Sequence, residues 1–414
     1  MKHLLIAALL VSMGVIADDA AKVEEPAAAS VEESGGHKDW PTLDEWWKAN
    51  KLNEGTMNAE VLLGYEYSDL DDAAGNDAAQ ALLTRTRISY KTANMEGFDA
   101  FIQGQYVAPI TDHYAPESAG YDVVADPENF RLHQVYMAYT GYDSHARIGS
   151  QEIILDNARL IGNVGWRLNA QSFNAGLVKN NSIEDLTLLY AYADSINDIF
   201  GNLNHNRQYH LLNAEYKLGE GNKVSAFAYL QRNDVGLDKL DTYGLRAWGK
   251  NKSISHDVML ASQRDAYYGN VFGEFDMDAV DVGLGVEYIS GGNNANERFQ
   301  TLNGTAHKFN GWADQFLGTG GGVEAGLIDF YGQVSGKIEK LKLMGACHWF
   351  NTADETAAGF DGDYGQEFDV LAKYPVCKNF SVLAKAAYYI KGDNHADNFT
   401  NDETVFWLRG TLTF

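Results

Sequence analysis

The chain has 414 residues, of which 45% are hydrophobic and 12% aromatic, and its formal net charge at pH 7 is -25. This acidic excess argues against a nucleic-acid partner, because the phosphate backbone carries charge of the same sign. Only 6 residues are Pro, against 41 Gly, 23 Tyr and 19 Phe, which suits a chain of many strands because Pro removes ladder donors. The mean hydropathy of -0.31 is compatible with a transmembrane barrel, in which alternate side chains face water.

The beginning of the chain predicts export. A short basic start precedes an apolar run over residues 4–16, and Ala17 ends a small-residue cleavage motif. We therefore expect residues 1–17 to be a secretory signal peptide, which is too short to span a bilayer as a helix. Residues 18–55 are predicted to form a disordered periplasmic tether with a short helix over 42–50. The tryptophans of that helix would rest at the membrane interface or, alternatively, partly plug the periplasmic mouth.

From residue 56 to 414 the sequence predicts one all-β unit, a transmembrane antiparallel barrel of about 18 strands. Segments of about ten residues with alternating polarity recur along it. They lie near 57–67, 81–92, 97–108, 130–141, 145–155, 171–180, 186–195, 208–218, 222–232, 241–250, 254–263, 267–277, 280–290, 324–336, 338–350, 365–374, 379–391 and 404–414. Short links alternate with long links rich in Asp, Asn and Gly, which places both barrel ends on the short-turn, periplasmic side. The link around Gln263 to Ala266 is an exception, too short for an outer loop.

The last predicted strand, 404–414, has an apolar face and a polar face that carries Arg409. A strand of this kind with an aromatic carboxyl terminus resembles the closing strand of bacterial outer-membrane barrels, which carries the signal read by the barrel-assembly machinery. The residues expected to carry that signal are Phe406, Leu408, Leu412 and Phe414, and the first three are expected to face outer-membrane lipid. We expect this strand to close the barrel against 57–67.

Charged residues within predicted strands identify the lumenal face. In 81–92, Arg85 and Arg87 share one face. A charge facing lipid at mid-depth would cost about 2–4 kcal/mol, so these arginines are expected to face the lumen. The same argument turns inward Arg147, Arg246 and Arg409. Two interpretations stand side by side: the arginines pair with lumenal carboxylates such as Glu60, Glu66, Asp99 and Glu152, or they form a basic constriction that favours anions.

The densest motif runs from Gly149 to Phe173, between two predicted strands. Its two arginines, Arg159 and Arg167, are unusual for an ordinary solvated loop. We expect this loop to fold back into the lumen, where both arginines meet wall carboxylates while Trp166 packs underneath.

This stretch resembles the alginate-export family of outer-membrane barrels, whose members carry Gly-Arg-Gln-Glu-Ile, Leu-Asp-Asn-Ala-Arg and Gly-Trp-Arg-x-Asn-x-Gln-x-Phe runs. A second match covers His307 to Leu317 and the Gly326 to Asp329 run. The resemblance implies an arginine-lined pore that passes an anionic polysaccharide. Carried over onto this sequence, its pore candidates are Gln151, Glu152, Asp156, Asn157, Arg159, Trp166 and Arg167.

Two departures from that family favour a general or anion-biased porin for small hydrophilic solutes. Ser150 stands where the family has arginine, which removes one basic group from the expected constriction. The turn at 219–222 is also too short for the periplasmic gating loop of the exporter.

The sequence carries no His-Glu-x-x-His, Gly-x-Ser-x-Gly or Cys-x-x-Cys motif, so we predict no catalytic residues, metal site or cofactor. Acidic residues near 69–72 and 361–363 depart from calcium-loop spacing and are expected to be solvated. Cys347 and Cys377 lie near opposite ends of their predicted strands, which disfavours a disulfide. The competing hypothesis is a structural or adhesive surface protein that binds partners through the long loop 291–323.

Overall fold

The computed structural model describes residues 54–71, 75–205, 207–233, 239–294, 296–301, 303–317, 323–354, 362–392 and 401–414. The predicted signal peptide and the predicted helix at 42–50 lie outside these ranges. No helix within these ranges is long and apolar enough to cross a membrane.

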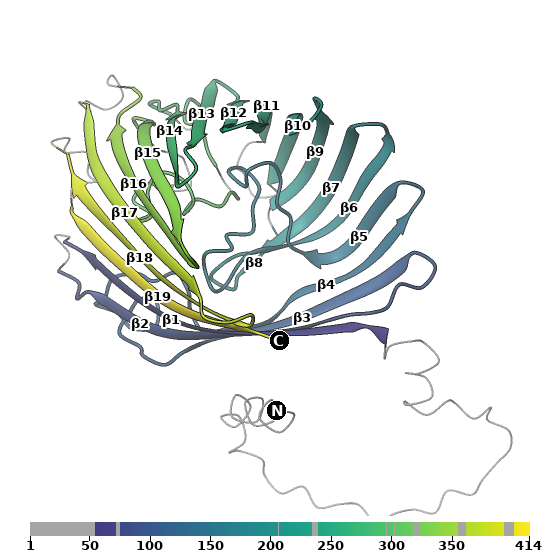
Figure 1. Cartoon of the computed structure of the whole chain (residues 1–414), viewed down its shortest axis with the longest axis horizontal. Helices are drawn as coiled ribbons and strands as arrows, with labels where there is room; N and C mark the ends of the chain where they lie inside the picture. Colours follow the sequence, from purple (N-terminus) through teal and green to yellow (C-terminus); the bar gives the residue numbers. More distant parts are fainter. Residues whose placement is uncertain are drawn as a thin grey trace, which may run out of the picture. The chain divides into compact units, whose positions relative to one another are not determined.

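The described residues form one antiparallel sheet of 19 strands (Figure 1). The strands are β1 (Thr56–Leu70), β2 (Ala79–Lys91), β3 (Phe98–Pro109), β4 (Asn129–Gly141), β5 (Ser144–Gln151), β6 (Ser172–Ile183), β7 (Leu186–Asn197), β8 (Leu203–Asn204), β9 (Arg207–Lys217), β10 (Asn222–Asn233), β11 (Leu240–Asn251), β12 (Ile254–Gln263), β13 (Ala266–Asp276), β14 (Val280–Ile289), β15 (Leu327–Ile338), β16 (Leu341–Asn351), β17 (Asp363–Pro375), β18 (Phe380–Lys391) and β19 (Glu403–Thr413). β8 pairs only with β7, and β7 pairs directly with β9. Without β8, the 19 strands leave a ring of 18, which confirms the predicted strand number.

The ring closes between the first and last strands. β19 pairs with β1 in a register that sets Leu408 opposite Tyr65, and the backbone nitrogen of Phe414 donates to the carbonyl of Ala59 at 2.8 Å. The predicted closure of 404–414 against 57–67 is therefore confirmed. A closed ring leaves no unpaired edge, as a sheet in hydrocarbon requires.

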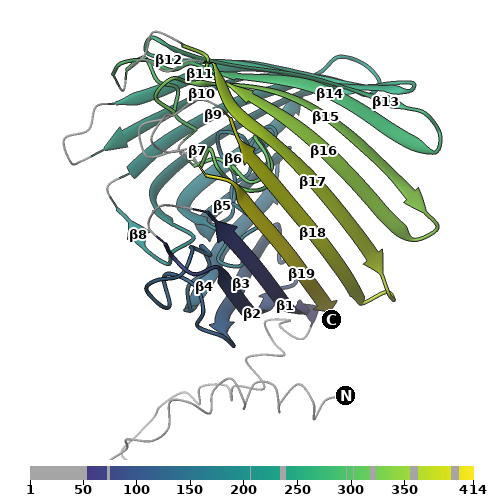
Figure 2. The same ribbon diagram turned by 90° about the vertical axis from the view of Figure 1, so that its left-hand side faces the viewer.

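The connections follow the predicted alternation of short and long. Two-residue turns at 142–143, 184–185 and 339–340 lie at one end, together with the start of β1 and the end of β19 (Figure 2). Long links at 110–128, 152–171 and 290–326 leave the other end. The exceptional link after β12 is a turn of Arg264 and Asp265 alone.

Two strand boundaries differ from the prediction. β5 ends at Gln151 rather than near 155, because the backbone nitrogen of Glu152 leaves the ladder and donates to Oε1 of Gln134 at 3.1 Å. β15 begins at Leu327 rather than near 324, because Gly326 takes a left-handed conformation with a φ of 65° and ends a turn.

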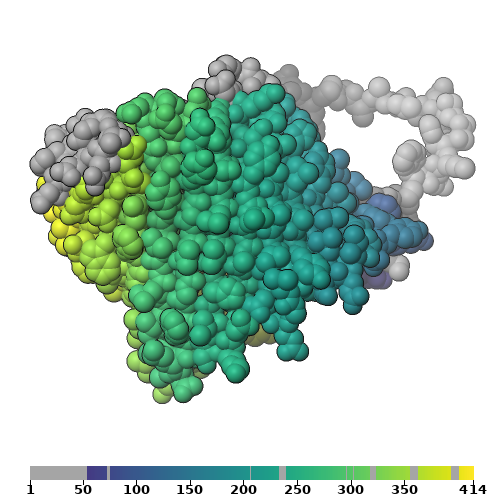
Figure 3. All heavy atoms as spheres, turned by 90° about the horizontal axis from the view of Figure 1, so that it is seen from above, coloured from purple at the N-terminus to yellow at the C-terminus, as the bar shows by residue number. Residues whose placement is uncertain are grey.

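The two faces of the strands are separated by polarity. Large apolar side chains predicted to face lipid are exposed on the outside, among them Ile102, Ile148 and Leu245. Inward polar residues such as Asp99 and Gln105 are buried, because long links fill the ring. The hydrophobic core therefore lies inside the barrel, and the outer wall of neighbouring strands forms a continuous surface that changes from teal to yellow along the chain (Figure 3).

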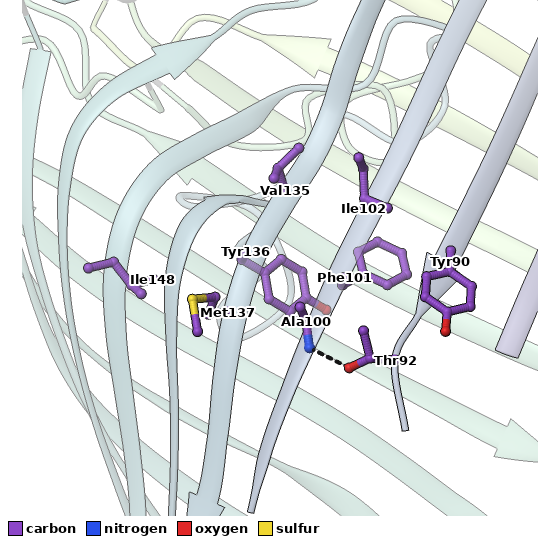
Figure 4. Close-up of a pocket in the computed structure, with 9 residues that line it drawn as sticks. All are labelled: Tyr90, Thr92, Ala100, Phe101, Ile102, Val135, Tyr136, Met137 and Ile148. Carbon is purple, nitrogen blue, oxygen red and sulfur yellow. Dashed lines mark hydrogen bonds between the residues drawn. The ribbon is translucent and has the colours of Figure 1, made fainter. Parts of the chain in front are cut away.

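A shallow pocket of about 340 Å³ on β2–β5 illustrates the apolar exterior (Figure 4). Its lining includes the exposed side chains of Ile102, Met137 and Ile148. Thr92 Oγ1 accepts a hydrogen bond from the backbone nitrogen of Ala100 at 2.9 Å, which ties the β2–β3 turn to the strand. An apolar exterior on a closed ring of strands is the architecture of a transmembrane barrel.

Charge substitutions on β15 should distinguish the two faces. Val334 is exposed on the outside, whereas neighbouring Gln333 points inward and donates to Oε2 of Glu274 at 3.0 Å. We expect Val334→Arg to lower the free energy of unfolding from lipid by about 2–4 kcal/mol, because it puts a cation into hydrocarbon. Gln333→Arg should cost much less, since the new cation can pair with Glu274. Equal losses in denaturant titrations of the two variants in lipid vesicles would contradict the assigned faces.

Candidate pore-lining site

The link between β5 and β6, residues 152–171, lies inside the ring of strands (Figure 1, blue to teal). Near its start, Oδ1 of Asp156 accepts a hydrogen bond from Oγ of Ser225 on β10 at 2.6 Å. Near its end, Nη1 of Arg167 donates to Oε1 of Glu66 on β1 at 2.8 Å. The segment thus reaches from one part of the wall to a distant part, and its predicted folding back into the lumen is confirmed.

Arg159 anchors the middle of this segment to β14. Its Nε donates to Oε1 of Glu287 at 2.8 Å, and its Nη2 donates to Oδ1 of Asn310 at 2.5 Å. The turn before it is stabilised by Asn157, whose Oδ1 accepts a hydrogen bond from the backbone nitrogen of Arg159 at 3.1 Å. Because Arg159 and Glu287 are both almost fully buried, loss of either partner would leave an uncompensated charge.

A second link, residues 303–317, also lies against the inner wall. Asn310 donates to Oδ2 of Asp329 on β15 at 3.2 Å, and the backbone nitrogen of Ala313 donates to Oε1 of Glu367 on β17 at 2.8 Å. Gly311 has a φ of 80°, and a Cβ at this position would overlap the carboxylate of Glu367. Glycine therefore allows this backbone to approach the wall. The sequence prediction treated this link as an outer loop.

The two in-folded links are joined to each other. Ile161 and Asn303 form a parallel bridge, and the backbone nitrogen of Gly162 donates to the carbonyl of Asn303 at 3.0 Å. Nε2 of Gln171 donates to the same carbonyl at 2.9 Å. The links therefore behave as one inner layer packed on the barrel wall.

Three indole rings surround Lys385 of β18. Its Nζ lies 3.7 Å from the ring centroid of Trp312, 4.2 Å from that of Trp166 and 5.1 Å from that of Trp407. Trp166 and Trp312 come from the two in-folded links, whereas Trp407 belongs to β19. The aromatic faces stabilise the buried ammonium and connect both links to the wall.

Lys385 also donates to a histidine. Its Nζ lies 2.6 Å from Nε2 of His307, so that nitrogen must be unprotonated, and Nδ1 of His307 donates to Oδ2 of Asp314 at 2.8 Å. Burial lowers the pKa of His307 to about 4, and nearby Lys385 acts in the same direction against Asp314. The ring therefore remains neutral at physiological pH and transmits a hydrogen bond between a cation and an anion.

The predicted lumenal arginines fall into two groups. Arg85 pairs with Glu60 at 2.7 Å and Arg246 with Asp257 at 2.7 Å. Arg409 packs over the ring of Trp166 at 3.7 Å, and its Nη1 donates to the carbonyl of the same residue.

Arg87 and Arg147 form the second group: each is half-buried and makes no ion pair with any residue in the described ranges. Nε of Arg87 donates to Oε1 of Gln105 at 2.6 Å. Arg147 stacks over the ring of Tyr136 at 5.3 Å. The guanidinium groups of Arg87 and Arg147 therefore lack the direct carboxylate partner that Arg85 and Arg246 have.

The sequence prediction missed Arg131 of β4. A β-bulge between Gln103 and Gly104 sets Leu132 opposite Gly104 but Gln134 opposite Gln103, so the residue between them is unpaired. Counting every second residue back from exposed Met137 would turn Arg131 toward lipid, whereas the bulge turns it inward. Its register partner is Gln105, which also binds Arg87.

Other predicted pore candidates occupy structural positions. Nε2 of buried Gln151 donates to the carbonyl of Ala175 at 2.9 Å. Oε1 of Glu152 binds Nε2 of His133 at 2.7 Å, and its Oε2 accepts a hydrogen bond from Asn163 at 2.8 Å.

Acidic residues gather on the inner face of the opposite strands. They are Glu287 on β14, Asp329 on β15, and Glu367 and Asp369 on β17. The in-folded links or His348 contact all four. Nδ1 of His348 lies 3.0 Å from both carboxylate oxygens of Asp329, and its Nε2 lies 3.6 Å from Oδ2 of Asp369. The inner layer therefore satisfies most of the acidic wall with hydrogen bonds and one ion pair, that of Arg159 with Glu287.

A cavity of about 620 Å³ opens between the inner layer and the long-link end of the barrel. Its charged and imidazole-bearing lining residues are Arg159, Arg167, Asp198, Arg207, His307 and Asp314. Apolar rings such as Phe299 and Phe316 complete the wall.

The fold is similar to that of solved barrels from two bacteria. OccAB4 of Acinetobacter baumannii matches with a TM-score of 0.67 and 13% identity over 88% of this chain and 99% of that chain. OccK9 (OpdG) of Pseudomonas aeruginosa matches with a TM-score of 0.66 and 15% identity over 88% and 100%. OpdQ of the same species matches with a TM-score of 0.64 and 15% identity over 87% of this chain and 99% of that chain. The chain has the fold of an outer-membrane porin. The porin fold and its apolar exterior place the chain in the bacterial outer membrane.

The sequence matches no protein-family model and no curated protein. Identities of 13–15% to the solved barrels establish the porin fold alone. The resemblance to the alginate-export family therefore rests only on the two motifs and stays a prediction.

The buried anchor at Arg159 can be tested by a double-mutant cycle. We expect Arg159→Met to raise amide exchange across residues 155–163, because Glu287 is then buried without its partner, at a cost of about 3–5 kcal/mol. Arg159→Met with Glu287→Leu should restore much of the protection, since no unpaired charge remains. Hydrogen exchange measured by mass spectrometry would contradict the anchor role if the single variant matched the wild type.

Proposed function

We propose that the chain is a passive outer-membrane channel for small hydrophilic solutes with a preference for anions. The closed ring with polar inward faces supplies a path through the bilayer that lipid cannot enter. The preference rests on one observation: the inner layer engages the acids of β14–β17 through Arg159 and hydrogen-bond donors, whereas Arg87 and Arg147 make no ion pair with any described residue.

The arginines have different roles in this proposal. Arg159 and Arg167 hold the inner layer in place through buried carboxylates, so their charge is largely cancelled. Arg87 and Arg147, with Arg131 between their strands, present the basic side of the path. Unpaired cations along a pore wall lower the barrier for anions and raise it for cations.

The inward position of residues 303–317 argues against the adhesive alternative. That hypothesis needs the long link after β14 as an outer binding surface, yet Asn310, Trp312 and Ala313 are buried in the lumen. A polysaccharide cargo gains no specific support, because the contacts of the inner layer involve only protein groups.

The described residues give no support to an enzymatic function comparable to the support for a channel. Within the described ranges, no group of three or more His, Cys, Asp or Glu side chains could hold a metal ion. The arginine-rich wall offers positive charge but no paired nucleophile and base.

Single-channel recording tests the proposal directly. The full chain, reconstituted in planar bilayers under a salt gradient, should give discrete open states and a reversal potential of the sign expected for anion preference. Absence of any open state would overturn the channel function, and cation preference would overturn the charge assignment while leaving the channel intact.

Selectivity should depend on the unpaired arginines. At a distance of about 8 Å in water, one unit charge contributes about 0.5 kcal/mol, or roughly a factor of two in anion preference. We therefore expect Arg87→Gln with Arg147→Gln to reduce the anion-to-cation permeability ratio by about fourfold. The control is Glu215→Gln with Lys223→Gln, which removes a neutral pair at 2.7 Å and should leave the ratio unchanged. A similar ratio for both variants would contradict the assigned role.

A further inference from the structure

Three lysines form a row on adjacent strands near the short-turn end of the barrel. Register pairs Lys337 on β15 with Lys342 on β16, and Lys342 with Lys373 on β17. Each occupies the inward face, because Lys337 is four residues from inward Gln333 and Lys373 is four residues from buried Asp369. The row therefore faces the lumen at the periplasmic mouth, beside the turn at 339–340.

Lys179 on β6 and Lys217 on β9 are also inward and exposed at this end, but only Lys217 stands opposite another lysine, Lys223. Three other lumenal lysines at the same end are ion-paired. Lys91 pairs with Asp99 at 3.4 Å, Lys223 with Glu215 at 2.7 Å and Lys250 with Asp276 at 3.1 Å. By contrast, the lysines of the row are exposed and make no ion pair with any other residue that the structure describes. Among the described residues of this rim, the row is the place where three lysines stand directly opposite one another on adjacent strands.

The surroundings add positive charge. Lys340 in the β15–β16 turn and Lys378 in the β17–β18 turn flank the row. The nearby acids are Glu339 in the first turn and Asp281 on β14, which faces Ser335 in the register. Glu274 and Asp276 on β13 lie further along the same face, where Glu274 accepts a hydrogen bond from Gln333 and Asp276 pairs with Lys250. None of these acids forms an ion pair with a lysine of the row, although the total charge of the chain is -25.

Like charges placed directly opposite on neighbouring strands are destabilising. Cross-strand side chains on one face have Cβ atoms only about 5 Å apart, so each lysine of the row repels the next. A multivalent anion would relieve both repulsions at once, because its oxygens can accept hydrogen bonds from adjacent ammonium groups. A monovalent anion could neutralise only one member of the row.

We propose that the lysine row Lys337, Lys342 and Lys373 is a binding site for soluble multivalent oxyanions, of the phosphate class, at the periplasmic mouth of the barrel. The inward face favours a soluble ligand over a lipid headgroup, since lipid contacts the opposite face of these strands. The site lies on β15–β17 and is separate from Arg87 and Arg147 on β2 and β5. It holds anions that reach the mouth from the periplasm or leave the pore.

Titration calorimetry with sodium pyrophosphate tests this site on the full chain in detergent at low ionic strength. We expect the wild type to bind, and Lys337→Gln with Lys342→Gln and Lys373→Gln to raise Kd at least about tenfold. The matched control is Lys91→Gln with Lys223→Gln and Lys250→Gln, which removes the same charge from the same rim. This control should change Kd by less than about threefold.

Equal weakening in the two triple variants would reduce the effect to general electrostatics and overturn the site, as would a wild type that does not bind. Folding of each variant is checked by circular dichroism and by heat-dependent mobility on gels. The row variant should still fold, because the substitutions remove repulsion between lysines. If the row variant nevertheless misfolds, Lys342→Gln alone, at the centre of the row, must weaken binding relative to Lys223→Gln.

A second titration distinguishes a soluble phosphate ligand from a lipid headgroup. The titration is repeated in nanodiscs of phosphatidylcholine with and without phosphatidylglycerol. Unchanged affinity supports a soluble ligand, whereas competition by phosphatidylglycerol would assign the row to a headgroup and overturn the proposal. Because calorimetry needs no ion flow, its result is independent of the single-channel recordings that test the channel itself.

Discussion

The interior of this barrel depends on ion pairs between in-folded arginines and carboxylates of the wall. A ring of 18 strands is too wide for its own side chains to fill, so added chain must pack inside or the lumen stays wet. Arg159 with Glu287 and Arg167 with Glu66 hold the added chain in place. Each pair is buried, so its geometry must satisfy both charges, and this requirement gives the link a specific position rather than loose packing.

These pairs also determine the field inside the pore. A barrel with acids on one wall and bases on the other would be close to balanced, but the inner layer covers the acids selectively. The backbone amides of 312–313 donate to Glu367, and the side-chain amide of Asn310 donates to Glu287 and Asp329. The contacts of the inner layer thus lie mainly on β14–β17, whereas Arg87 and Arg147 make no ion pair with any described residue.

Alternation of polarity was sufficient to predict the architecture. All 18 ring strands and the closure of 404–414 on 57–67 follow from it, because period two reports directly on the two solvents of a membrane strand. The alternation of polarity gave the wrong face at the start of β4, because one bulged residue reverses the two faces there and turns Arg131 inward. It also missed the inward position of 303–317, since that link is held largely by backbone amides and by Gly311, which leave no charge pattern in a sequence. The sequence could not predict which arginines are paired, because partners such as Arg159 and Glu287 are 128 residues apart.

The position of the barrel seam implies an order of assembly. The loop residue Arg167 binds Glu66 of β1, and neighbouring Trp166 is held by Arg409 and Trp407 of β19. The first and last strands to be synthesised therefore build one shared binding surface, which exists only after they have paired. The lumenal layer must acquire its final contacts late, when the ring is already closed, so that an unclosed barrel stays open inside and its arginines stay hydrated until the seam forms.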